Sequence, residues 1–285
     1  MVFIKKAFAK DFESIYPLFE MFNNPNLNKE DWNKLFIKHC DTDEDYFGFV
    51  LMDDNKVVGF LGAIFSDRVI RDKIYKFCNM TAWVVKKEYR SYGILLINQF
   101  NKLTEYTITD LTPTYGAYDV FKKFEYKDLD NFIKLFIPFP NFKIFNKDYR
   151  IYFDNEIIRS ILNDNDIKIF SDHLKFKKNN VVICCKNNYC YLIISITKRK
   201  GIRLAHIHYI SNKTLFYDSF NIFRLKLCLK FKVFGIIIDE RFVETLNIFG
   251  SFKVKLKLSG LYKSNELERK DIDILYSELF ILNHL

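Results

Sequence analysis

The feature that most constrains this chain is a strand that leads through a short basic loop into a helix. Residues 77–85 are apolar enough for a buried strand, and four apolar residues then recur at roughly helical spacing: Leu95, Leu96, Phe100 and Leu103. A helix that begins near Ser91 directs its free backbone N–H groups and positive dipole end at any anion beside the strand end. Gly93 lets a ligand approach the backbone closely. The junction therefore predicts a phosphate-binding site.

The junction resembles the pyrophosphate-binding loop of the GNAT-type N-acyltransferases. The residues that match the family pattern are Val85, Glu88, Tyr89, Arg90 and Gly93. Two positions depart from it: Lys87 stands where the family usually has Pro, and Leu95 stands where it usually has a second Gly or Ala. A bulky side chain at the second position would crowd a bound pyrophosphate.

The resemblance implies a site for coenzyme A carrying an acetyl group. The backbone of residues 90–95 would hold the pyrophosphate, and the exposed backbone of residues 83–85 would orient the pantetheine and the thioester carbonyl. The candidate cofactor-binding residues are Trp83, Val84, Val85, Arg90, Ser91, Tyr92, Gly93, Ile94 and Leu95. The implied reaction is acetyl transfer to an amine. An amino sugar is the first candidate acceptor, and a peptide or another small amine is the next.

The order of elements around the junction agrees with the resemblance. Residues 2–8 read as a strand, Asp11 and Asn28 are good helix N-caps, and residues 47–65 read as a hairpin with its turn at 53–55. A further strand at 106–111 and a helix at about 115–124 follow. The family has the same order, so the resemblance spans residues 2–126. It implies an α/β (α+β) fold with a mixed, mainly antiparallel sheet flanked by helices.

The last helix of this region lacks the tyrosine that protonates the departing thiolate in many family members. Phe121 occupies that place, and a phenyl ring has no proton to give. The candidate acid is Tyr118, which lies three residues earlier on the same helix face. Tyr115, water and unassisted thiolate departure are the alternatives. Phe121 also permits a different interpretation, a non-catalytic binding module that kept the fold and lost the chemistry.

The second half of the chain reads as a degenerate copy of the first. Residues 181–185 and 191–196 form a second hairpin pattern, and a strand at 202–210, a helical stretch at about 214–230 and a buried strand at 233–239 follow. The loop at 211–214 has no glycine, so a second cofactor site is not expected. These patterns predict tandem domains at 1–148 and 149–285. Residues 271–279 are predicted to form a final helix that docks on the second domain.

His206 and His208 lie two residues apart and so point to the same side of a strand. One hypothesis makes His208 the base or an anchor for the substrate, because the first domain's junction strand offers no carboxylate and histidine titrates near neutral pH. The structural alternative is a pair of half-buried strand histidines. No third ligand at a telling spacing supports a metal site.

Composition limits the remaining classes of function. The net charge of +9 lies mostly in the second half, spread over many elements without a nucleic-acid-binding motif, so a nucleic-acid partner is not expected. Lysines 198 and 200 with Arg199, and Lys253, Lys255 and Lys257, read as a hairpin tip and an edge strand, or as a surface for an anionic substrate such as a nucleotide-linked amino sugar.

The six cysteines show no zinc-knuckle spacing and read as reduced thiols. No signal peptide or long apolar run is apparent, so a cytoplasmic location without a membrane partner is expected.

Overall fold

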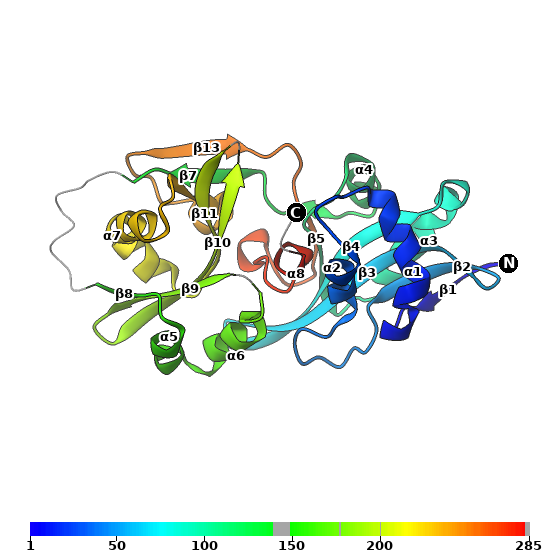
Figure 1. Ribbon diagram of the computed structural model, residues 1–285, viewed down its shortest axis with the longest axis horizontal. Coiled ribbons are helices and arrows are strands. Elements are labelled where there is room, and N and C mark those ends of the chain that lie inside the picture. Colours follow the sequence, from blue (N-terminus) through cyan, green and yellow to red (C-terminus); the bar gives the residue numbers. More distant parts are fainter. Residues whose placement is uncertain (139–148, 177, 200, 283–285) are drawn as a thin grey trace. The chain divides into compact units, whose positions relative to one another are not determined.

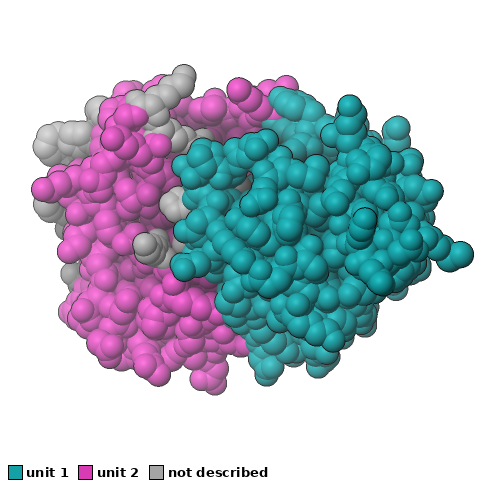
Figure 2. Space-filling model, turned by 45° about the vertical axis from the view of Figure 1, so that its right-hand side comes forward, with its two compact units in different colours: residues 1–129, 258–285 teal, residues 130–257 magenta. Residues whose placement is uncertain are grey.

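The computed structural model describes residues 1–138, 149–176, 178–199 and 201–282. The chain divides into two compact units, which Figure 2 distinguishes by colour. Unit 1 consists of residues 1–129 and 258–285, and unit 2 of residues 130–257. This division departs from the expected boundary between residues 148 and 149, because the chain leaves the first unit earlier and returns to it near the end.

Unit 1 is built on a seven-stranded sheet with the order β1-β2-β3-β4-β5-β14-β6 (Figure 1). Its strands are β1 (Val2–Lys6), β2 (Gly48–Asp53), β3 (Lys56–Ile70), β4 (Lys73–Val85), β5 (Tyr106–Asp110), β6 (Lys127–Asp128) and β14 (Leu261–Lys263). Among these described strands only the β4–β5 pair is parallel. The predicted hairpin is confirmed as β2 and β3, with its turn at Asp54 and Asn55.

Helices cover both faces of this sheet. They are α1 (Phe12–Phe19), α2 (Lys29–Asn33), α3 (Gly93–Asn101), α4 (Tyr115–Lys123) and α8 (Glu278–Ile281), with 3₁₀ helices at Ala9–Asp11, Glu20–Phe22, Lys34–Phe36, Lys87–Tyr92 and Arg269–Asp271. Successive side chains of β3 point to opposite faces. Phe60 contacts Phe19 of α1, whereas Leu61 packs in the cluster that contains Leu96 of α3.

The two predicted N-caps of unit 1 have different outcomes. The Asn28 side chain accepts a hydrogen bond from the Asp31 N–H at 2.9 Å and so caps α2 as predicted. Asp11 makes no capping bond to α1. Its carboxylate instead accepts the N–H of Phe8 at 2.9 Å, which closes the short 3₁₀ turn before the helix.

Unit 2 repeats the architecture with the order β13-β7-β12-β11-β10-β9-β8. Its strands are β7 (Phe132–Phe136), β8 (Arg150–Tyr152), β9 (Asn179–Cys185), β10 (Asn188–Arg199), β11 (Ile202–Ile210), β12 (Gly235–Asp239) and β13 (Ser251–Lys255). Its helices are α5 (Asn155–Ile161), α6 (Asp164–His173) and α7 (Lys213–Phe231), with a 3₁₀ helix at Glu240–Phe242. Of the strand pairs described here, only β11 and β12 run in parallel.

The two sheets match strand for strand when the second is read from its β8 edge. In this order β8, β9, β10, β11 and β12 correspond to β1, β2, β3, β4 and β5. The sixth place is held by β14 in the first sheet and by β7 in the second. Each half of the chain therefore gives one strand to the sheet built mainly by the other half. The predicted tandem arrangement is confirmed, and this exchange explains the departure from the expected boundary.

The predicted helix at residues 271–279 is wrong in both extent and placement. The segment is a 3₁₀ turn at Arg269–Asp271 followed by irregular chain, and the helix α8 covers only Glu278–Ile281. It belongs to unit 1, where Asp273 pairs with Arg68 of β3 and Asp271 pairs with Arg71. The segment is held in unit 1 by these distant ion pairs and by buried apolar side chains such as Ile272 and Phe280.

Other expectations fall on the sheet edges and the cysteines. Lys253 and Lys255 lie on β13, which is an edge strand as predicted, and Lys257 lies beyond its end. Lys198 is near the β10–β11 turn, whereas Lys200 and the Arg199 side chain lie outside the described residues. All six cysteines are free thiols.

Two features are absent from the described ranges, a membrane-spanning helix and a cluster of metal ligands. No helix there is both long and apolar enough to cross a membrane. The same residues contain no group of three or more His, Cys, Asp or Glu side chains that could hold a metal ion.

Candidate active site

The site in unit 1 begins where the parallel strands β4 and β5 stop pairing. Their register runs from Lys76 opposite Tyr106 to Asn79 opposite Thr109 and then ends, although β4 continues to Val85. On its other side β4 stays paired with β3, across a bulge at which Leu61 faces two residues. Within the described part of the chain, residues 81–85 of β4 therefore have no strand partner on the β5 side, and their backbone groups there are open to a ligand.

The bulge places Ala82 in the left-handed region, with φ of 52°. A non-glycine residue in this region is uncommon and is held by its surroundings. The extra residue interrupts the alternation of side chains along β4 just where the pairing with β5 has ended. Nothing in the sequence indicates this bulge, because alanine is not a residue that favours positive φ.

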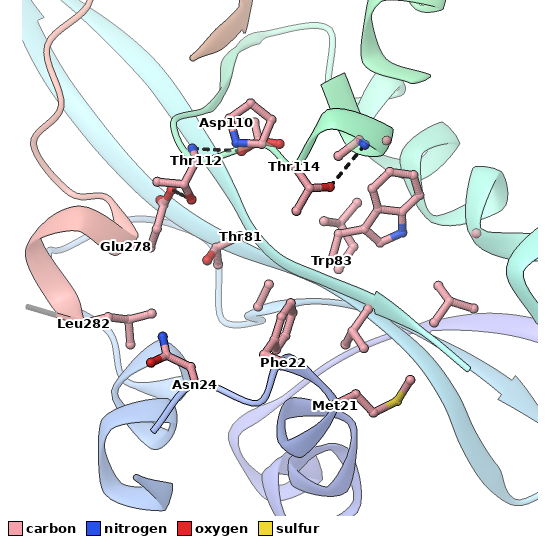
Figure 3. Close-up of a pocket in the computed structure, with 18 of the residues that line it drawn as sticks. Met21, Phe22, Asn24, Thr81, Trp83, Asp110, Thr112, Thr114, Glu278 and Leu282 are labelled. Carbon is pink, nitrogen blue, oxygen red and sulfur yellow. Dashed lines mark hydrogen bonds between the residues drawn. The ribbon is translucent and has the colours of Figure 1, made fainter. Parts of the chain in front are cut away.

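A cavity of about 720 Å³ opens at this unpaired edge (Figure 3). It is lined from β4, from the start of α3, from the loop between β5 and α4, from the α1–α2 connection and from the C-terminal segment. The lining residues on the last three elements include Met21, Phe22, Asn24, Asp110, Thr112, Thr114, Glu278 and Leu282. Apolar groups and a few polar groups thus converge on one concave surface, as in small-molecule sites.

The expected phosphate-binding junction is only partly open. A 3₁₀ helix, Lys87–Tyr92, connects β4 to α3, which begins at Gly93 rather than near Ser91. The Gly93 N–H donates to the carbonyl of Arg90, and the Tyr89 N–H donates to the carbonyl of Lys86. Those N–H groups are therefore already occupied. The α-helix thus begins two residues after the start predicted near Ser91, and the 3₁₀ turn before it leaves fewer free N–H groups than expected.

Five of the nine predicted cofactor-binding residues line the cavity: Trp83, Val84, Val85, Arg90 and Gly93. The other four, Ser91, Tyr92, Ile94 and Leu95, are exposed and do not line it. Leu95 therefore does not fill the cavity. The indole Nε1 of Trp83 is buried and has no hydrogen-bond partner among the described residues, so a donor remains for a ligand.

Two carboxyl groups in the cavity were not predicted from the sequence. Asp110 ends β5, and Glu278 begins α8; both side chains are buried. Burial raises the pKa of Glu278 to about 7. Burial first, and then the charge of Glu278, raise the pKa of Asp110 well above its ordinary value. The junction strand β4 itself has no carboxylate, as noted from the sequence, and these two groups come from its neighbours.

Comparison with solved structures identifies the architecture. A GCN5-related N-acetyltransferase of Anabaena variabilis superposes with a TM-score of 0.62 at 13% identity over 92% of this chain and 72% of its own. The corresponding enzyme of Kribbella flavida gives 0.59 at 10% identity over 92% and 70%. A GCN5-related glucosamine N-acetyltransferase region of a fungal multi-domain GH3 β-N-acetylglucosaminidase gives 0.55 at 12% identity over 92% and 38%. The chain has a tandem GNAT fold.

At these identities the likeness establishes the fold and leaves the activity to the site itself. No protein-family model matches the sequence. No curated protein matches it either.

Phe121, at the position where many GNAT proteins have the acidic tyrosine, packs in the core. Phe121 is fully buried, and its ring lies 5.5 Å from that of Trp83. The Tyr118 hydroxyl donates to a carboxylate oxygen of Asp128 at 2.7 Å, and this bond raises the pKa of Tyr118 to about 12. Neither Tyr118 nor the exposed Tyr115 lines the cavity. The helix therefore brings no phenolic proton to the cavity.

The two histidines lie on β11 of unit 2 and point the same way as predicted, with ring centroids 4.2 Å apart. His208 is buried, its Nε2 lies 2.7 Å from the Ser195 hydroxyl, and burial holds its pKa well below the ordinary value. It is not among the residues that line the cavity of unit 1. This environment fits the structural interpretation, a neutral histidine paired across the β10–β11 ladder.

Proposed function

We propose that unit 1 transfers an acetyl group from coenzyme A to the amine of a small molecule. The observation that carries this proposal is the unpaired edge of β4, which opens onto a cavity with Arg90 and Gly93 on one part of its wall and Asp110 and Glu278 on another. A single site thus offers a strand edge for one substrate and carboxyl groups for a second.

The residues present fit coenzyme A in three respects. The free backbone groups of residues 81–85 can pair with the amides of the pantetheine arm, as a further strand would. The Trp83 N–H is buried without a partner among the described residues, and the Arg90 guanidinium is a strong ligand for phosphate. The closed 3₁₀ turn supplies fewer N–H groups than the sequence suggested, so Arg90 carries more of the phosphate contact in this proposal.

The acceptor proposed first is an amino sugar. A sugar needs several hydrogen-bonding side chains as well as an apolar surface on which its ring can lie. Asn24, Thr81 and Thr114 supply hydrogen-bonding side chains. Phe22 supplies an apolar surface. One structural neighbour contains a glucosamine N-acetyltransferase region, which supports this choice of class. A nucleotide-linked amino sugar and other small amines remain the alternatives.

The reaction needs no tyrosine at position 121. The amine nitrogen attacks the thioester carbonyl, the new C–N bond forms, and the C–S bond breaks with departure of the thiolate. A thiolate is a tolerable leaving group, and holding both substrates in one cavity can supply much of the rate.

The deciding experiment combines binding with turnover. Titration calorimetry with acetyl-CoA should give one site per chain, and an amine panel including glucosamine should release free thiol. A chain that binds acetyl-CoA but releases no thiol with any amine would instead be the binding module that the buried Phe121 also permits. Failure to bind acetyl-CoA would disprove the proposal.

A further inference from the structure

Resting on the acetyl transfer proposed above, we propose that Glu278 is the general base of unit 1 and that the acceptor enters as a primary ammonium ion bound by its carboxylate. The residue lies far along the chain from β4, and the irregular C-terminal segment carries it to the cavity. This assigns a catalytic role to a segment whose sequence pattern suggested only a docking helix.

The Glu278 side chain is 1% exposed, and it lines the cavity beside Thr112 and Thr81 (Figure 3). One carboxylate oxygen accepts the Thr112 hydroxyl at 2.8 Å. The other, Oε2, is buried and has no hydrogen-bond partner among the described residues. A buried carboxylate oxygen without a donor is costly, and an ammonium group in the adjoining cavity would provide the donor.

Contacts with β3 and β4 hold the C-terminal segment in place and so fix the position of the Glu278 carboxylate. Asp273 pairs with the buried Arg68 of β3. The N–H of Glu278 donates to the Asn79 amide oxygen at 3.4 Å. Asn79 is the residue at which β4 stops pairing with β5, so Glu278 is held directly at the start of the unpaired edge.

The charges around Glu278 suit a base that works near neutral pH. Burial is the main cause of its raised pKa, which lies at about 7, and the Thr112 hydrogen bond acts in the opposite direction. Asp110 is the carboxyl group whose own pKa the charge of Glu278 raises. Lys34, on the 3₁₀ helix that packs against α8, has its ammonium group on Asp31. Near pH 7 about half of the Glu278 side chains are then ionised. Enough of the carboxylate form is present to act, and it is basic enough to take a proton from the amine.

The step is balanced without a further reagent. The ammonium gives one proton to Glu278, the neutral nitrogen forms a bond to the thioester carbonyl carbon, and the sulfur leaves with the electron pair of the broken C–S bond. The second proton lost from nitrogen passes to solvent or to the thiolate. The base also predicts specificity: amines with an uncharged or cationic body are favoured over an anionic one such as a nucleotide-linked amino sugar, because the Glu278 carboxylate repels negative charge.

The test compares the parent protein with Glu278→Gln and with Glu266→Gln as a matched control on the same segment. Glutamine preserves the shape and can still accept from Thr112, but it cannot take a proton. We expect acetyl-CoA affinity to be unchanged in all three proteins. Turnover of the best amine should fall by about 10²-fold in Glu278→Gln alone, and the inflection near pH 7 in the pH profile of kcat/KM should disappear.

Thr112→Val provides an independent variant that keeps the carboxylate. Because the Thr112 hydroxyl stabilises the charged form of Glu278, its loss should move the inflection to higher pH. This readout would decide the question if Glu278→Gln failed to fold.

The remaining outcomes separate this inference from the proposed function. Turnover by Glu278→Gln within about threefold of the parent, or with the inflection retained, would overturn the assignment while leaving acetyl transfer intact. Binding of acetyl-CoA with neither turnover nor binding of glucosamine or butylamine would also overturn it. A parent protein that does not bind acetyl-CoA would overturn both.

Discussion

Each unit buries a carboxyl group beside its sheet, and the two groups differ in how many of their oxygens accept a hydrogen bond. In unit 2, Asp166 accepts the Tyr189 hydroxyl at 2.8 Å on one oxygen and the Tyr209 hydroxyl at 3.0 Å on the other. In unit 1, Glu278 has a hydroxyl on one oxygen, and the other is buried without a partner among the described residues. A carboxylate with both oxygens bonded already has its donors, whereas one left half-bonded is suited to a ligand.

The starts of the helices that follow β4 and β11 also differ in whether a side chain caps them. The Asn212 side chain accepts the Leu215 N–H at 3.0 Å and so caps α7. In unit 1 neither Lys86, before the 3₁₀ helix, nor Tyr92, before α3, makes a side-chain cap. At this helix start unit 2 uses a side-chain cap, whereas the corresponding region of unit 1 has none. The absence of a glycine at residues 211–214 already suggested this asymmetry.

The largest expected effect is a gain in stability for Glu278→Gln at alkaline pH. The folded-state pKa of Glu278, about 7, exceeds its ordinary value of 4.5, so the folded protein binds this proton more tightly than the unfolded chain. The free energy of unfolding of the parent should therefore fall as pH rises from 4.5 to 7. Glutamine removes this loss, which amounts to at most about 3 kcal/mol. Urea unfolding at about pH 5 and about pH 8 measures it, and equal stabilities at the higher pH would contradict the assigned burial.

The second prediction concerns ligand access in the two units. A Cβ at Gly93 would lie 3.4 Å from Trp83 and Val85, an ordinary contact, but the two methyl groups of valine extend further into the space beside the cavity wall. Gly93→Val should weaken acetyl-CoA binding by roughly 30-fold, or about 2 kcal/mol.

The control for this change is Thr214→Val, at the start of α7 in unit 2. It should leave both the affinity and the single-site stoichiometry unchanged in calorimetry. Equal weakening by the two variants, or two sites per chain in the parent protein, would remove the distinction between the units.

Asp166→Asn is the counterpart of the Glu278 substitution and should have a smaller effect of the same sign. Burial raises the pKa of Asp166, but the hydroxyls of Tyr189 and Tyr209 act in the opposite direction. We expect a gain in stability at about pH 8 that is smaller than the gain of Glu278→Gln, measured by urea unfolding. A destabilised variant would show that the hydrogen bonds outweigh burial in unit 2.

The smallest effect is expected for Tyr118→Phe. Because the hydroxyl is engaged with Asp128 and lies outside the cavity wall, turnover should stay within about twofold of the parent. The complementary variant is Phe121→Tyr, which tests directly whether a proton donor at that position still increases the rate. A fall of about 10²-fold in Tyr118→Phe would restore Tyr118 as the acid.

Local pattern was enough to predict the parts of the fold that depend on neighbouring residues. The turn at Asp54 and Asn55, the buried strand β4 and the cap at Asn28 all follow from short-range chemistry. The bulge at Ala82 and the 3₁₀ turn before Gly93 did not, because both depend on how β4 is held by its neighbours. Glu278 could not be found in this way, because its position depends on a strand and several ion pairs that join residues far apart in the sequence.

The place of β14 between β5 and β6 also orders events during synthesis. A nascent chain that has produced β5 and β6 still lacks the strand that joins them, and it must make all of unit 2 before residues 261–263 emerge. Such distant pairing is slow to form, and the open edges of β5 and β6 remain liable to mispairing in the meantime. Glu278 emerges later still. A chain released before residue 278 therefore lacks the carboxylate on which the proposed chemistry depends.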